Sequence, residues 1–355
     1  MLDYKKIFAV APFSMSQRKK EKWYYKYQKE LTLYHYQNCI EYKKVADRIF
    51  GALNNSKNIS DLPFIPAYLF KDFDLKSEND KNSSTILTSS GTSGSKTSRI
   101  HLDKKTSLLQ SRALSIIFSN ILNKKRSTIF FVDTPNILSG LDSLSARGTA
   151  IRGFSQLVRK SVFLLDEKFN LKIDKLTKFI KQNPSEQFVI FGFTSFLWTH
   201  LIQKMQTNKI KLSKNKGILI HGGGWKKMND QAVDRVVFNA HIKDVIGVHS
   251  IHNYYGMVEQ TGSVFLECEF GFFHSSIFSE IIVRDNNLKL SPIRQNGLLQ
   301  VLSLLPLSYP GHNILTEDIG ALEGIDDCNC GRKGKYFSIK GRVPGTELRG
   351  CSDVY

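Results

Sequence analysis

Residues 188–224 read FVIFGFTSFLWTHLIQKMQTNKIKLSKNKGILIHGGG, and this stretch contains the pattern that decides the fold. The apolar segments Phe188–Phe191 and Gly217–Ile220 have the length and composition of buried strands. Ser195–Gln206 between them is typical of a helix, and the glycine run Gly222–Gly224 follows the second strand directly. Strand, helix and strand in this order predict a parallel sheet covered by helices.

The same alternation continues on both sides of this stretch. Further buried strands are predicted at Ile129–Val132, Ser161–Leu165 and Asp244–His249. Further helices are predicted at Lys104–Leu122, Ile173–Gln182 and Asn229–Ala240. After Gly262 the pattern changes to shorter strands and turns. We therefore expect an α/β fold with mostly parallel sheets flanked by helices and with a smaller β-rich subdomain.

Residues Ser14 to Gly51 form a separate region with the composition of one or two long helices. Ser14 and Ser16 can cap the start of such a helix, and Gly51 can end it. Cys39 lies inside this region and is expected in the core. The aromatic side chains expected to pack inward are Trp23, Tyr27, Tyr34 and His35.

The composition excludes several classes of protein. With 41% hydrophobic and 23% charged residues, the chain does not resemble a disordered one. Its longest mostly apolar run, Phe188–Trp198, is shorter than the roughly 20 residues that a membrane-spanning helix needs. The start of the sequence lacks an apolar stretch followed by a cleavage site. We expect no signal peptide, no membrane span and a cytoplasmic location.

The formal net charge of +18 has two interpretations. The basic residues are spread along the chain, with only short clusters such as Lys19–Lys22, Lys124–Arg126 and Lys226–Lys227. This distribution favours a lysine-rich solvated surface and no nucleic-acid partner. The competing interpretation is a nucleic-acid-binding protein, which would bind DNA or RNA with a steep salt dependence.

Three segments combine residue types suited to nucleotide chemistry. Thr88-Ser-Ser-Gly-Thr-Ser-Gly-Ser-Lys-Thr97 offers backbone N–H groups, hydroxyls and a cation to phosphates, although its glycine spacing excludes a P-loop. Asn253-Tyr-Tyr-Gly-Met-Val-Glu259 places an acidic residue after a strand. His221-Gly-Gly-Gly-Trp225 would let a ring or a phosphate approach the backbone. Each segment alone also fits a flexible linker or a structural turn.

Taken in order, these segments resemble the motifs of the adenylate-forming (ANL) superfamily of acyl-CoA synthetases, luciferases and adenylation domains. Two later segments, Thr316-Glu-Asp-Ile-Gly320 and Gly341-Arg342, match that family's ribose-binding aspartate and its Gly-Arg pair. Val258 stands where the wider superfamily has threonine. The four matches in order are Thr88–Lys96, Asn253–Glu259, Thr316–Gly320 and Gly341-Arg342, and together they are far more specific than one.

A closer resemblance, to LuxE-type acyl-protein synthetases, covers nearly the whole chain. It rests on Leu62-Pro-Phe-Ile-Pro66 with Phe70-Lys71, and on His221–Lys226, Tyr255–Gly262 and Arg349-Gly-Cys-Ser352. In that branch the valine at position 258 is ordinary. The resemblance implies an adenylating domain of the N-terminal type without the mobile C-terminal domain that carries a catalytic lysine. What replaces that lysine stays open.

The resemblance also implies the cofactors ATP and Mg²⁺ and a set of site residues. Lys96 and Glu259 would be catalytic, with Glu259 holding the magnesium ion. The residues implied in nucleotide binding are Ser89, Ser90, Gly91, Thr92, Ser93, Gly94, Gly222, Gly223, Gly224, Tyr255, Gly256, Asp318 and Arg342. Among them, Gly222–Gly224 and Tyr255 would flank adenine, Asp318 would bind ribose, and Arg342 would touch ribose or phosphate. Attack of a carboxylate on the α-phosphate of ATP makes a mixed anhydride, and catalysis of such a step consists of positioning and charge neutralisation.

Cys351 is the implied acyl acceptor, because Arg349-Gly-Cys-Ser352 matches the acylated cysteine of the LuxE branch. An unperturbed thiol is only a few per cent thiolate at neutral pH. Arg349 should favour the thiolate, whereas Glu347 and Asp353 oppose it. Without the resemblance, an idle cysteine would be the simpler interpretation.

The five cysteines, an odd number, do not predict a disulfide framework. Cys268, His274, Cys328 and Cys330 are the ligand types that zinc accepts, and they form a candidate structural zinc site. The alternative is a group of buried free thiols, since Cys-x-Cys is a tight spacing for a metal.

We therefore expect an acid–thiol ligase that adenylates a fatty or related acid and loads Cys351 for a partner such as an acyl reductase. The alternative is direct delivery to a carrier-protein or coenzyme A thiol, in a surface-polysaccharide or secondary-metabolite pathway. The expected regions are an N-terminal helical region (1–84), an α/β nucleotide-binding core (85–262), a β-rich subdomain (263–342) and a tail with the acceptor cysteine (343–355).

Overall fold

The computed structural model describes residues 2–51, 56–77, 85–89, 97–122, 127–140, 143, 145–225, 228 and 231–344. They divide into two compact units. The first unit holds the described residues within 1–88, 95–118 and 256–347, and the second those within 119–255 together with residue 89. Each unit has its own strands and its own core.

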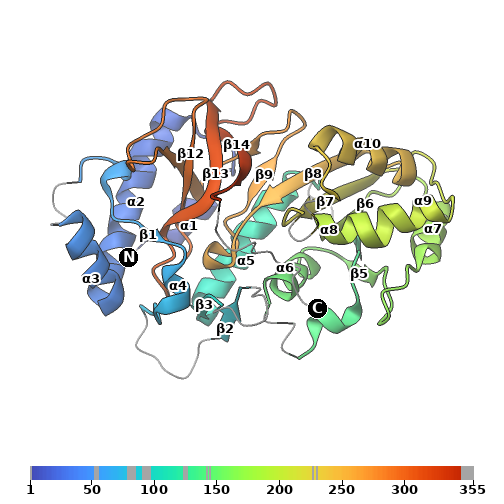
Figure 1. The fold of residues 1–355 in the computed structure, drawn as a ribbon, viewed down its shortest axis with the longest axis horizontal. Helices are drawn as coiled ribbons and strands as arrows, with labels where there is room; N and C mark the ends of the chain where they lie inside the picture. The colour runs from blue at the N-terminus through green and yellow to red at the C-terminus, as the bar shows by residue number, and fades with distance from the viewer. Residues whose placement is uncertain are drawn as a thin grey trace. The chain divides into compact units, whose positions relative to one another are not determined.

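The second unit contains a parallel sheet in the strand order β8-β7-β6-β4-β5. Figure 1 labels β5, β6, β7 and β8 of this sheet. Every residue of β4, β6 and β7 is buried, which is typical of parallel strands covered on both faces. The strands are β4 (Thr128–Phe131), β5 (Lys160–Phe163), β6 (Phe188–Phe193), β7 (Gly217–Gly222) and β8 (Ser250–Tyr255). The helices are η3 (Pro135–Leu138), α6 (Ala146–Ser155), α7 (Ile173–Gln182), α8 (Thr194–Phe196), the π-helical η5 (Leu197–Ile202), α9 (Gln203–Thr207) and α10 (Arg235–Ile246). The predicted alternation of strands and helices is confirmed.

The strand predicted at Asp244–His249 is wrong, because α10 continues to Ile246 and β8 begins only at Ser250. The Asp234 side chain caps α10 by accepting a hydrogen bond from the N–H of Val237, so the helix also begins later than expected. Gly247 ends it with φ +71°, and a Cβ there would lie 2.5 Å from a backbone oxygen. The apolar residues before Gly247 therefore face the core from the last helical turn.

The first unit contains a largely antiparallel sheet in the order β11-β12-β13-β14-β10-β9, and β1 pairs in parallel with β13. Its strands are β1 (Ile65–Pro66), β9 (Phe265–Glu267), β10 (Phe273–His274), β11 (Ser279–Arg284), β12 (Asn296–Ser303), β13 (Asn313–Ile325) and β14 (Lys335–Arg342). A separate pair is formed by β2 (Thr85–Thr88) and β3 (Arg99–Leu102). Strand pairing is thus mixed: parallel in one unit and mainly antiparallel in the other.

Most helices of the first unit lie before the sheet in the sequence. They are α1 (Tyr4–Phe8), α2 (Gln17–Asn38), α3 (Ile40–Phe50), η2 (Ile59–Asp61), α4 (Leu69–Asp72) and α5 (Lys104–Ser119), followed later by η7 (Val258–Gln260). Ser16 is the N-cap residue of α2, and Gly51 ends α3 with φ +69°. The prediction of one or two long helices is confirmed, and Cys39 is buried between them. Of the described helices, none is both long and apolar enough to cross a bilayer.

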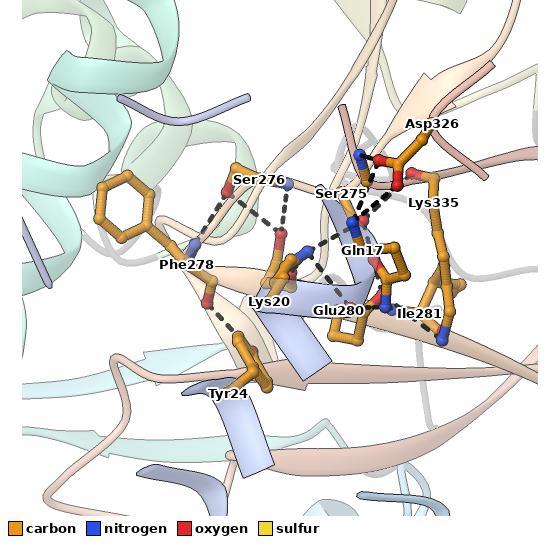
Figure 2. Close-up of polar contacts among 12 residues, drawn as sticks. Gln17, Lys20, Tyr24, Ser275, Ser276, Phe278, Glu280, Ile281, Asp326 and Lys335 are labelled. Atoms are coloured by element: carbon orange, nitrogen blue, oxygen red, sulfur yellow. Dashed lines mark hydrogen bonds and ion pairs between the residues drawn. The ribbon is translucent and has the colours of Figure 1, made fainter. Parts of the chain in front are cut away.

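A buried ion network fixes α2 to the sheet of the first unit (Figure 2). The ammonium group of Lys20 lies 3.3 Å from the Glu280 carboxylate, and both side chains are 1% exposed. Lys335 lies on the other side of Glu280, 3.8 Å away. Gln17 donates a hydrogen bond to the same carboxylate at 2.9 Å. Desolvated charges of this kind are tolerated only when they are paired and hydrogen-bonded.

The backbone around this network supplies further hydrogen bonds. Lys20 donates to the carbonyl of Ser279 at 2.8 Å and to the hydroxyl of Ser275 at 3.1 Å. Asp326 accepts hydrogen bonds from the backbone N–H groups of Gln17 and Gly334, at 2.9 Å and 2.7 Å. The network therefore joins the start of α2 to β11 and to the turn before β14.

The contribution of Glu280 to stability should depend on pH. Burial alone would raise the pKa of Glu280, but Lys20, Lys335 and the hydrogen bonds lower this pKa from 4.5 to about 2. A lowered folded-state pKa gives stability that is present above pH 4.5 and is lost as the pH falls toward 2. The pH-dependent part is on the order of 3 kcal/mol.

The measurement is urea unfolding of the wild type and of Glu280→Gln at several pH values between 7 and 3. The difference in unfolding free energy between the two proteins should be largest at pH 7 and shrink below pH 4.5. All other carboxylates are present in both proteins, so their effect on the unfolding free energy at low pH cancels in this difference. A difference that stays constant down to pH 3 would contradict the charged state assigned to Glu280.

Candidate active site and metal-binding cluster

The glycine run after β7 forms a turn in the second unit that only glycine fits well. Gly222 is the last residue of β7, and Gly223 and Gly224 follow with φ +82° and +67°. A Cβ on Gly222 would lie 2.6 Å from the ring of Tyr254. The ring of Tyr254 therefore packs directly on this backbone.

The end of β8 lies beside this turn. β7 and β8 are parallel neighbours, and Gly222 is the register partner of Tyr254. Gly222, Gly223, Gly224 and Tyr255, predicted to flank adenine, thus lie at the carboxyl ends of adjacent parallel strands. In open α/β sheets this edge is where ligands bind. The structure brings these residues together, and their contact with adenine stays a prediction.

A buried histidine, His221, is linked through Thr194 to the glycine turn. The hydroxyl of Thr194 lies 3.0 Å from His221 Nδ1 and donates to the Gly222 carbonyl at 3.0 Å. The single hydroxyl hydrogen of Thr194 is already donated to the Gly222 carbonyl. The Nδ1–H of His221 must therefore donate to the Thr194 oxygen. Burial, with Arg235 adding to it, lowers the pKa of His221 to about 3, so the imidazole is neutral. Sequence reasoning did not single out Thr194, whose role depends on the fold.

Glu259, the predicted magnesium ligand, lies on η7 in the first unit and is 4% exposed. The next residue, Gln260, holds this short helix in place: its amide donates to the carbonyls of Val301 at 2.9 Å and Gly311 at 2.8 Å. A Cβ on Gly311 would lie 2.5 Å from the Glu259 carbonyl, so this packing is close. The backbone position of Glu259 is therefore well defined, which is one requirement for a metal-binding residue.

Asp318 and Arg342 face each other across β13 and β14. They are register partners, and the Arg342 guanidinium lies 3.2 Å from the Asp318 carboxylate. Arg342 also donates to Glu317 at 2.7 Å, a carboxylate that the sequence did not single out. All three side chains are about one-quarter exposed or less. The structure thus brings the predicted ribose ligand and the predicted ribose or phosphate ligand together, and their roles stay predictions.

The four candidate zinc ligands form one cluster in the first unit, called here the Cys/His cluster. The ligand atoms of Cys268, His274, Cys328 and Cys330 all lie within 4.8 Å of one another. The first three residues are buried, and Cys330 is partly exposed. This group could hold a metal ion.

Several predicted site residues fall outside the residues that the structure describes. They are Ser90, Gly91, Thr92, Ser93, Gly94, Lys96 and Cys351. Ser89 is described and follows β2 directly. Of the other nucleotide-site residues, Gly222–Gly224 and Tyr255 belong to the second unit, whereas Gly256, Glu259, Asp318 and Arg342 belong to the first.

Comparison with protein families and with individual proteins gives matches along nearly the entire chain. The profile of the family described as "Acyl-protein synthetase, LuxE" matches residues 3–355. A long-chain-fatty-acid–luciferin-component ligase of Vibrio harveyi is 24% identical over 354 residues, covering 94% of this chain and 89% of that protein. The corresponding ligase of Aliivibrio fischeri is 26% identical, covering 86% of this chain and 83% of that protein.

Solved structures with the same fold include 2-hydroxyisobutyryl-CoA ligase. Its open conformation, with 2-HIB-AMP and CoA, superposes with a TM-score of 0.72 at 14% identity, covering 93% of this chain and 76% of that one. Its postadenylation state, with R3-HIB-AMP, gives a TM-score of 0.69 and covers 93% of this chain and 69% of that one. The similarity establishes the adenylating-ligase fold.

Proposed function

The chain belongs to the LuxE acyl-protein synthetase family of adenylate-forming acid–thiol ligases, and from this premise we propose that it activates a fatty or related lipophilic acid with ATP and transfers the acyl group to Cys351. The observation that carries the proposal is the match of the family profile over residues 3–355, which includes the motif around this cysteine. The curated relatives named above are ligases for long-chain fatty acids.

In the first step the acid carboxylate attacks the α-phosphorus of ATP. An oxygen–phosphorus bond forms, pyrophosphate leaves, and the acid becomes an acyl-adenylate with a good leaving group. Such a step is accelerated by positioning the two reactants and by neutralising the developing phosphate charge. We assign the phosphates to Ser89–Lys96 and magnesium to Glu259, a buried residue whose carboxylate oxygens suit a hard cation.

The nucleoside part of ATP is assigned to the described residues at the strand ends. Gly222–Gly224 would offer a backbone free of side chains to adenine, and Tyr255 an aromatic ring. Asp318 would accept hydrogen bonds from the ribose hydroxyls, and Arg342 would hold that carboxylate in place through the 3.2 Å contact. ATP and Mg²⁺ are thus the proposed cofactors, and the Cys/His cluster takes no part in this reaction.

In the second step the thiolate of Cys351 attacks the acyl carbonyl carbon. A carbon–sulfur bond forms, the bond to the AMP oxygen breaks, and AMP leaves with the negative charge. The thioester remains reactive enough to pass the acyl group to a partner protein such as a reductase. A thiol loses its proton more readily beside a cation, and Arg349 lies two positions before Cys351.

The test is ATP–pyrophosphate exchange with acids of graded chain length in the presence of magnesium. We expect exchange with long-chain acids, and Glu259→Gln should lower its rate by about 10²–10³-fold because one oriented charge is lost at the developing phosphate charge. Glu167→Gln, at an exposed glutamate, is the matched control and should exchange at the wild-type rate. Absence of exchange across the full panel with wild-type protein would overturn the proposal.

A further inference from the structure

Two distances within the Cys/His cluster are close to those of a tetrahedral zinc site. Zinc–sulfur bonds of about 2.3 Å and zinc–nitrogen bonds of about 2.0 Å place two sulfurs about 3.8 Å apart, and a sulfur and a nitrogen about 3.6 Å apart. The sulfurs of Cys268 and Cys328 are 3.9 Å apart, and the Cys330 sulfur lies 3.3 Å from His274 Nε2. Since all four ligand atoms also lie within 4.8 Å of one another, a single zinc ion could bind all of them.

The alternative of a disulfide does not fit this geometry. A sulfur–sulfur bond is about 2.05 Å long, roughly half the distance between Cys268 and Cys328. Cys330 and His274 lie close to the same two sulfurs. A disulfide between Cys268 and Cys328 would not explain why these two further ligand-type side chains lie there. Three thiols and an imidazole that meet at one point indicate a shared ligand rather than a pairwise bond.

The backbone around the cluster holds its cysteines in tight turns. The N–H of Cys268 donates to the Phe272 carbonyl at 2.9 Å, and the N–H of Gly331 donates to the Cys328 carbonyl at 3.0 Å. Gly331, with φ +79°, closes the Cys328–Cys330 turn, so both sulfurs of this tight pair can reach the same centre.

The ring of His274 is held by packing. It stacks on Tyr336, with ring centroids 5.5 Å apart, and meets the edge of Phe13 at 6.4 Å. This orientation keeps Nε2 directed toward Cys330. Cys268, Cys328 and Tyr336 form a small buried core with Phe272 and Cys330 packed against it, which would exclude water from the ion.

From these observations we propose that Cys268, His274, Cys328 and Cys330 bind one structural Zn²⁺. Three thiolates and one imidazole suit a soft or borderline ion and not Mg²⁺ or Ca²⁺. The four protein ligands complete a tetrahedron and leave no open position for substrate, so the site is structural. This proposal does not rest on the adenylation reaction.

The zinc ion would fix the turn that joins β13 to β14. That turn also holds the N-terminal segment, because the N–H of Lys333 donates to the Phe13 carbonyl and Arg332 lies over the Phe13 ring. β14 follows this turn and ends at Arg342, which pairs with Asp318 of β13. Loss of the metal should therefore loosen the start of the chain and the register of β14 together.

The experiment measures metal content in untagged full-length protein purified without chelator. We expect about one zinc per chain, release of that zinc when the thiols are titrated with a mercurial, and a lower Tm after release. Cys268→Ser and Cys330→Ser should lose the zinc, whereas Cys39→Ser, at a buried cysteine outside the cluster, should keep it. Exchange for Co²⁺ should give the absorption of a tetrahedral thiolate site.

Wild-type protein that contains no zinc and takes up neither Zn²⁺ nor Co²⁺ after full reduction would overturn the proposal. So would retention of one equivalent in both cluster variants. If a variant fails to fold, the mercurial titration of the wild type decides alone, because zinc must leave in proportion to the cluster thiols modified. None of these readouts uses ATP or an acid, so a failure here leaves the ligase proposal untouched.

Discussion

Replacement of Cys351 by alanine is expected to abolish covalent acylation of the protein while leaving acyl-adenylate formation intact. The first step uses the carboxylate and ATP only, so it needs no thiol. The second step has no nucleophile once the sulfur is gone, and the acyl-adenylate should then remain bound or hydrolyse slowly. The expected effect on the acyl-protein is complete loss.

The measurement combines intact mass with pyrophosphate exchange. Wild-type protein incubated with acid, ATP and magnesium should gain the mass of one acyl group, and hydroxylamine should remove it. Cys39→Ala is the matched control, since Cys39 is a buried cysteine in the N-terminal helices and should leave the acyl adduct unchanged. Full turnover of Cys351→Ala with coenzyme A or a carrier protein would instead favour direct delivery to that thiol.

The second large effect is expected in stability, from breaking the buried network around Glu280. Lys20→Met should lower the free energy of unfolding by about 3–5 kcal/mol, because it leaves a buried carboxylate with Lys335 as its remaining cation. Methionine has a similar length, so packing changes little. Urea unfolding of the folded variant measures the loss.

The chain offers an exposed ion pair as a matched control. Lys211 and Asp244 are 2.7 Å apart, but their side chains are 66% and 56% exposed. Lys211→Met should therefore cost only about 0–1 kcal/mol. The double variant Lys20→Met with Glu280→Gln should be less destabilised than the sum of its single changes, since the uncompensated charge is gone. Equal losses of unfolding free energy in Lys20→Met and Lys211→Met would contradict a larger contribution of the buried network to stability.

Local pattern was enough to predict most of the parallel unit. Phe188–Phe191 and Gly217–Ile220 are apolar runs of strand length, and Ile173–Gln182 is a helix with the bounds expected from its periodicity. The error at Asp244–His249 has a physical reason. A short apolar run fits a buried strand and the buried last turn of a helix equally well, and the cap at Asp234 and the turn at Gly247 decided between them.

The candidate site was predictable only in its residue types. The glycine run and Glu259 stand out in the sequence, but the ring of Tyr254 on Gly222 and the hydrogen bonds of Gln260 do not. Glu317, which shares Arg342 with Asp318, gave no signal of its own because an acidic residue in a strand is usually solvated.

The sequence by itself determined the family, the alternation of strands and helices, and the identity of the residues able to carry chemistry, because each depends on neighbours within a few positions. Only the tertiary structure decided which distant residues meet. Cys268 and Cys328, 60 positions apart, come together because antiparallel register aligns the turns that carry them. Lys20 meets Glu280 because α2 packs on the sheet at one position along its length. Such contacts depend on register and packing of whole elements, which no local pattern encodes.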